Sequence, residues 1–103
     1  MESEQKFNIY IGLLKSDMKT ELNKENTIKL IVNKLKNIGV IGLNIESIKG
    51  YWNGKPENAL KISFINTFNV LYTDIIKVLE DLKTDLQQEN ILIEQEQVLY
   101  SFI

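Results

Sequence analysis

The hydrophobic periodicity changes along this chain, and that change constrains the fold more than any other feature. From Phe7 to Leu14, apolar residues occupy every second position, as in a half-buried β-strand. Residues 28–38 instead repeat their apolar positions at helical spacing, with Asn23 as a candidate N-cap and Gly39 as a C-cap. The sequence therefore predicts a strand followed by a helix of about four turns.

The same change of period recurs in the rest of the chain. Residues 40–48 predict a second strand of less regular pattern, and Ala59 to Ile65 predicts a third. We expect a turn from Trp52 to Asn58 to join these two strands as a hairpin. An apolar stripe then predicts a longer helix that begins at Thr67 or Asn69. Residues 90–103 predict a last strand, with a break near Gln95 to Gln97.

This order of elements defines the expected fold class. A β-α-β-β-α-β sequence with right-handed crossovers gives an α+β, ferredoxin-like domain, in which two helices cover one face of a four-stranded antiparallel sheet. We expect one domain over residues 1–103. The uncovered face would then carry Tyr10, Ile65, Leu92 and Tyr100, so we expect a homodimer or higher oligomer. The alternative is a register shifted by one residue, which would exchange the two faces.

The composition narrows the range of functions. The chain has no Cys, His or Arg, so it lacks the common nucleophile, acid–base group and metal ligands. We therefore expect no metal, no cofactor and no enzymatic activity. The 12 Lys are outnumbered by 14 Asp and Glu, which disfavours binding of duplex nucleic acid. The N-terminus does not resemble a signal peptide and no run is long enough to cross a membrane, so we expect a location in the host cell cytoplasm.

The segment between Gly50 and Ile62 is the first candidate site, because it holds the only Trp and the only Pro of the chain. Its aromatic residues could form a platform for a ring, and its carboxylate and amide could bind ribose hydroxyls or a base edge. The alternative is an Asn-Gly hairpin turn with the Trp packed over it and a solvated strand start. The candidate ligand or partner residues are Tyr51, Trp52, Asn53, Glu57 and Asn58.

The loop after the first strand is the second candidate. Lys15, Asp17 and Lys19 could bind an anion there, although a plain polar turn has the same composition. Glu94 and Glu96 lie two residues apart on one predicted strand, which could suggest paired acid–base carboxylates. With no partner residue to tune them, we interpret them instead as charges that protect an edge strand.

Three stretches resemble a known family. Asn8 to Thr20 is similar to the "IYIGLNDKDTK" opening of small proteins carried by phages and other mobile elements of low-GC Gram-positive bacteria. Gly50-Tyr51 and Glu57 to Ser63 look like the turn and the "ENTLRIEI" strand of that family, and Gln87 to Glu89 is similar to its later "NQE". Leu14 departs from the family, which has Asn there. The resemblance implies a phage or plasmid accessory protein, a class that often inhibits or sequesters host components.

Two functions follow from these features. The first is a non-catalytic binder that sequesters a small nucleotide-like signal of a host defence system, in clefts between the hairpin of one subunit and the first loop of another. The PII-type regulators are a fold-level analogy for such a binder. The second is a protein-binding inhibitor of a host defence protein, such as a CRISPR or other immune effector, with Tyr51 and Trp52 as the anchor.

Overall fold

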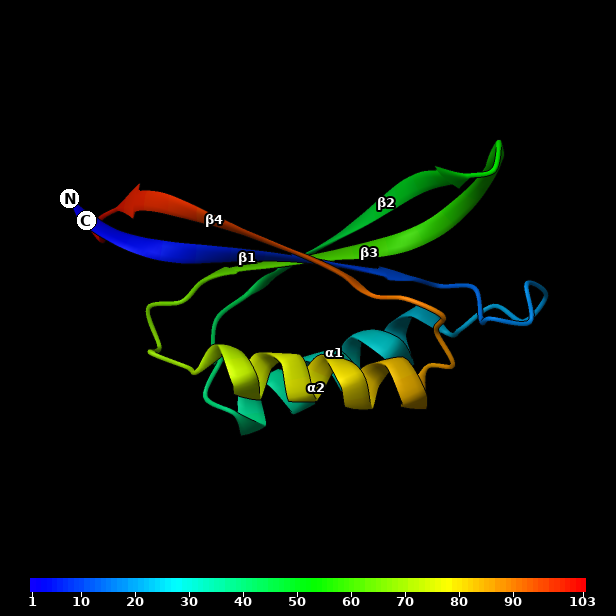
Figure 1. Ribbon diagram of the computed structural model, residues 1–103, viewed down its shortest axis with the longest axis horizontal. Coiled ribbons are helices and arrows are strands. Elements are labelled where there is room, and N and C mark those ends of the chain that lie inside the picture. Colours follow the sequence, from blue (N-terminus) through cyan, green and yellow to red (C-terminus); the bar gives the residue numbers. More distant parts are fainter.

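The computed structural model describes residues 1–103, and its elements follow the predicted β-α-β-β-α-β order. The strands form one antiparallel sheet in the order β2-β3-β1-β4, and both helices cover one face of it (Figure 1). The α+β, ferredoxin-like fold expected from the sequence is therefore confirmed. The elements are β1 (Glu2–Gly12), α1 (Lys24–Asn37), β2 (Asn44–Trp52), β3 (Lys55–Ile65), α2 (Tyr72–Asp85) and β4 (Leu92–Tyr100).

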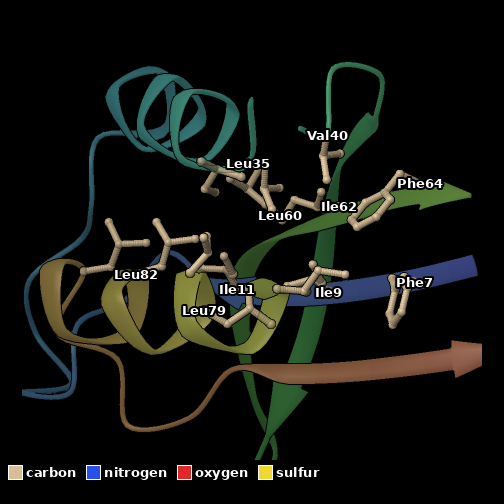
Figure 2. Close-up of a cluster of buried hydrophobic side chains, with 14 of the residues drawn as sticks. Phe7, Ile9, Ile11, Leu35, Val40, Leu60, Ile62, Phe64, Leu79 and Leu82 are labelled. Carbon is tan, nitrogen blue, oxygen red and sulfur yellow. The ribbon is translucent and has the colours of Figure 1, made fainter. Parts of the chain in front are cut away.

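The core forms between the two central strands and the helices. On β1, the predicted inward residues Phe7, Ile9 and Ile11 are buried, and they pair with Phe64, Ile62 and Leu60 of β3. Figure 2 shows these side chains meeting Leu35 of α1 and Leu79 and Leu82 of α2. Each fully buried aliphatic side chain stabilises the fold by about 1.5–3 kcal/mol, so this layer fixes which face of the sheet meets the helices.

The helix ends follow from local hydrogen bonds. As predicted, the Asn23 side chain caps α1 by accepting from the Asn26 amide at 2.9 Å, and Gly39 follows the helix with a φ of 104°. The predicted start of α2 at Thr67 or Asn69 is wrong, because the helix begins at Tyr72. The Asn66 side chain both donates to the Val70 carbonyl and accepts from the Val70 amide, which holds the intervening residues as a loop.

The predicted long turn of the hairpin is also wrong. Only Asn53 and Gly54 form the turn, with φ values of 51° and 77°, and both strands continue to it. An Asn-Gly pair favours this turn because both positions need left-handed backbone. Pro56 made the sequence look like a loop, but it pairs only with β2, since the pairing of β3 with β1 ends at Ala59.

The predicted break in the last strand does not occur. Residues Leu92–Tyr100 pair continuously with β1. Glu94, Glu96 and Gln97 lie opposite polar residues of β1, whereas Gln95 lies opposite Phe7 and finds its polar partner diagonally. Gln95 donates to Gln5 at 3.2 Å, and Gln97 donates to the Ser3 hydroxyl at 2.6 Å. Polar residues on both faces are therefore compatible with a strand here, because β4 is an edge strand and β1 supplies matching partners.

The uncovered face of the sheet mixes apolar and charged residues. The registers place Tyr10, Ile65, Leu92 and Tyr100 on it as predicted, which excludes the register shifted by one residue. Charged residues share this face, including Glu94, which accepts a 2.7 Å hydrogen bond from the Tyr10 hydroxyl. That bond raises the pKa of Tyr10 above its ordinary value. No helix of the chain is long and apolar enough to cross a membrane.

Candidate functional site

The candidate site lies at the end of the sheet where β1 stops and the β2–β3 hairpin projects past the helices (Figure 1). The loop after β1 lies at the same end and is tied to the hairpin by backbone hydrogen bonds. Leu13 donates to the Asn58 carbonyl at 2.9 Å, and Leu22 donates back to Leu13 at 2.7 Å. The two segments singled out from the sequence are therefore neighbours within one chain.

A cavity of about 280 Å³ lies between them. Its walls come from the end of β1, the loop before α1, the first residue of α1, and the two strands of the hairpin. Half of the lining residues are apolar and half carry an amide, a hydroxyl or a charge. Such a mixture suits a small ligand with a flat apolar part and polar edges. The lining residues are Leu13, Glu21, Leu22, Lys24, Ser47, Ile48, Asn58 and Ala59.

Glu57 and Asn58, predicted to act together, project from opposite faces of β3. Asn58 lines the cavity, whereas Glu57 lies with its carboxylate against Gly12 at the end of β1. A Cβ at Gly12 would collide with Glu57 Oε1 and would also approach Gln88 Oε1 at 3.4 Å. Gly12 therefore allows the half-buried Glu57 carboxylate to approach the sheet closely, and Gln88, which donates to the Leu14 carbonyl, lies beside it.

The predicted residues of the first loop are used mainly to shape that loop. Asp17 accepts hydrogen bonds from the Thr20 hydroxyl at 2.5 Å and from the amides of Thr20 and Lys19 at 2.8 Å. These bonds, led by the one from the Thr20 side chain, lower the pKa of Asp17 to about 2. Neither Lys15 nor Lys19 lines the cavity.

The remaining predicted residues lie at the tip of the hairpin, outside the cavity. Tyr51 is 72% exposed and Trp52 is 71% exposed, and Asn53 occupies the turn itself. The Asn-Gly turn of the alternative interpretation is therefore confirmed, whereas Trp52 is largely exposed. These aromatic side chains form a separate exposed surface, which we call the hairpin tip.

Of the eight lining residues only Asn58 was a predicted site residue. The seven that were missed are Glu21, Leu22, Lys24, Ser47, Leu13, Ile48 and Ala59. The first three flank the N-cap Asn23, and an isolated β-bridge between Leu14 and Glu21 turns this segment toward the hairpin. No local sequence pattern predicts such a bridge. The only indication of these wall residues in the sequence was the polar stretch immediately before the helix.

The fold places the chain among ferredoxin-like proteins that include PII-like regulators. No protein-family model matches the chain, and no curated protein matches it by sequence. The solved structure of CPII, a nitrogen regulatory PII-like protein from Thiomonas intermedia, was determined with ADP, AMP and bicarbonate. It is 16% identical, covers 98% of each chain and has a TM-score of 0.53.

A phage SAM lyase is more similar in structure. Its apo form superposes with a TM-score of 0.73 over 94% of this chain and 86% of the lyase chain, at 20% identity. A second structure of a phage SAM lyase holds S-methyl-5'-thioadenosine. It has a TM-score of 0.69 and 20% identity, and it covers 90% of this chain and 80% of the other. At these identities the likeness establishes the shared fold.

This comparison contradicts the prediction that the chain is not an enzyme. A phage enzyme has the same fold over 94% of this chain. The prediction assumed that catalysis in so small a domain would require Cys, His or Arg, none of which the chain contains. The lack of these three residue types therefore does not exclude an enzymatic activity.

Proposed function

We propose that this chain is a phage or mobile-element enzyme that binds SAM (S-adenosylmethionine) in the cavity beside the hairpin and cleaves it to S-methyl-5'-thioadenosine. The observation that carries the proposal is the position of the cavity of about 280 Å³. It lies where the hairpin meets the first loop, in a fold shared with a phage SAM lyase.

The cavity walls suit an adenosyl group. Leu13 and Leu22 offer apolar contact to a flat purine ring. The Asn58 amide and the Ser47 hydroxyl line the same space, and both can donate to and accept from ribose hydroxyls or base edges. We therefore keep Asn58 as a proposed ligand-binding residue and add Ser47 as a second one.

The reaction needs little from the protein. In SAM, the carboxylate of the methionine portion can attack its own γ-carbon and form a five-membered lactone. A new C–O bond forms, the C–S bond breaks, and its electron pair stays on sulfur. The products are S-methyl-5'-thioadenosine and homoserine lactone, and no external base or nucleophile is used. The site then accelerates the reaction by holding the substrate in a folded conformation, away from competing water.

The test is to incubate the purified protein with SAM and to quantify products by liquid chromatography with mass detection. We expect S-methyl-5'-thioadenosine and homoserine lactone in equal amounts. Ser47→Phe, which places a ring in the cavity, should abolish turnover, whereas Ser101→Phe, at the far end of the molecule, should not. Substrate that remains intact after prolonged incubation with the folded wild-type protein would contradict the proposal.

In the host cell, such an enzyme would remove a nucleotide-like molecule that host defence systems use. This biological role extends the proposal, and it is tested by expressing the chain in the bacterial host. We expect the cellular SAM pool to fall and S-methyl-5'-thioadenosine to rise with the wild-type chain only. Equal pools with the wild-type chain and with Ser47→Phe would contradict this role.

A second candidate function is binding of a host protein through the hairpin tip. The observation that favours it is the pair of exposed aromatic residues Tyr51 and Trp52, because aromatic anchors dominate many protein interfaces. Trp52→Ala should then abolish inhibition of a host defence protein in cells. Because Trp52 is exposed, the variant should keep its thermal stability and its SAM turnover. A loss of stability of about 3–5 kcal/mol would instead place Trp52 in the core.

A further inference from the structure

Two opposite charges line the cavity without neutralising each other. Glu21 and Lys24 are both wall residues, and both side chains are exposed to solvent. Neither takes part in an ion pair. The two ion pairs of the chain lie elsewhere, between Lys6 and Glu96 and between Lys34 and Asp85. The cavity thus has one anionic and one cationic wall group available for a ligand.

The backbone fixes the position of Glu21. It forms a β-bridge with Leu14, and the next residue, Leu22, donates to the Leu13 carbonyl at 2.7 Å. These backbone contacts therefore hold the loop that carries Glu21 against the end of β1. A carboxylate on a backbone segment that is already fixed loses less conformational freedom on binding a cation than one on a mobile loop.

Lys24 occupies a position that does not favour a cation. It is the first residue of α1, directly after the N-cap Asn23, where the helix dipole is positive. The usual residues there are acidic, so helix stability does not account for a lysine. The Asn26 amide is bonded to the Asn23 side chain, whereas the amides of Lys24 and Glu25 have no partner inside the helix and attract anions. Lys24 and these amides together would bind a carboxylate well.

We infer that Glu21 and Lys24 bind the zwitterionic amino-acid end of the ligand. Lys24, with the free amides of Lys24 and Glu25, takes the α-carboxylate, and Glu21 takes the α-ammonium group. The inference rests on the proposed function, because it assigns the methionine end of SAM to this wall. An α-amino acid carries an ammonium group and a carboxylate on the same carbon, which matches two opposite charges that line the same cavity. A nucleoside phosphate such as AMP offers no cation to Glu21 and would be repelled by it.

The test uses two ligands that share the adenosyl group. S-adenosylhomocysteine carries the amino-acid end but no sulfonium, so it is not cleaved, whereas S-methyl-5'-thioadenosine lacks the amino-acid end. Calorimetric titration should show that Lys24→Met and Glu21→Gln each lower the affinity for S-adenosylhomocysteine by about tenfold, as expected for a lost hydrogen bond to a charged group. The affinity of each variant for S-methyl-5'-thioadenosine should stay within about twofold of the wild-type affinity, because this ligand has no amino-acid end to contact the two residues.

Matched variants control for the change of net charge. Lys29→Met lies on an exposed position of α1, and Glu80→Gln lies on an exposed position of α2, so neither should alter either affinity. Thermal unfolding of all four variants checks that the fold is retained.

The outcomes separate the two proposals. If wild-type protein binds both ligands equally and the wall variants change nothing, the inference is overturned while the adenosyl site stands. Equal weakening of both ligands by the wall variants would also overturn it, because the residues would then support the whole site. If the wild-type protein binds neither ligand, the proposed function itself fails.

Discussion

The Asp17 carboxylate accepts all three of its hydrogen bonds from Thr20 and Lys19, within its own loop. A short polar side chain followed by amides two and three residues later favours this local closure. The sequence pattern of Lys, Asp and Lys looked suitable for an anion, but the anionic member is used to build the turn. At the scale of single residues, the role of a polar side chain such as Asp17 depends on its hydrogen-bond partners. The spacing of residues in the sequence does not by itself identify those partners.

The first prediction concerns the pH dependence of this loop. The pKa of Asp17 is lowered from 3.8 to about 2, so the ionised form is favoured in the folded state. The stabilisation is therefore fully present above the unfolded pKa and is lost as the pH falls through the folded pKa. An NMR titration should give a midpoint near 2 for Asp17, with the amide resonance of Thr20 shifting in parallel. A midpoint at the ordinary aspartate value would show that these hydrogen bonds do not form.

The hairpin shows what a sequence can and cannot predict at the scale of an element. Alternating residues Leu60, Ile62 and Phe64 indicated β3 correctly, because burial of one face imposes a period of two. Its true start at Lys55 was missed, because Pro56 usually ends a strand and is tolerated here only beyond the end of β1. Strand and helix types follow from local periodicity, whereas their ends depend on partners distant in the sequence.

The second prediction tests the hairpin turn with two glycines. Gly54 has a φ of 77°, so Gly54→Ala should destabilise the fold by about 1 kcal/mol. Gly50 is the matched control, because its φ lies outside the left-handed region and a Cβ there would meet nothing within 4 Å. Gly50→Ala should be neutral or slightly stabilising in urea unfolding. Equal losses in the two variants would contradict the turn geometry.

At the scale of the whole molecule, the fold could be predicted from the sequence, but most of the site could not. The order of periodic segments was sufficient for the ferredoxin-like topology. The cavity combines Asn58 with Glu21 and Lys24, residues that meet only after the loop following β1 packs against the hairpin. No local sequence pattern predicts that these distant segments lie next to each other. The expectation of no enzymatic activity was also wrong, because it relied on the missing Cys, His and Arg, whereas a phage enzyme shares the fold.

The homo-oligomer stays a prediction. It rests on Tyr10, Ile65, Leu92 and Tyr100, which the register places on the uncovered face of the sheet. We expect sedimentation equilibrium to give at least a dimer at tens of micromolar protein, since large apolar side chains on an uncovered sheet face favour self-association even where charged residues lie between them. A monomer over that range would contradict it.

The central claim is that the cavity beside the hairpin holds an adenosyl ligand, and mapping the amide resonances on titration with S-methyl-5'-thioadenosine tests it most directly. We predict saturable shifts at the wall residues, with Leu13, Leu22, Ser47 and Asn58 changing most. A second hollow at the opposite end of the molecule serves as the internal control, and Phe68 and Tyr100, which line it, should stay unchanged. Shifts confined to that far hollow, or no shifts at millimolar ligand, would contradict the account.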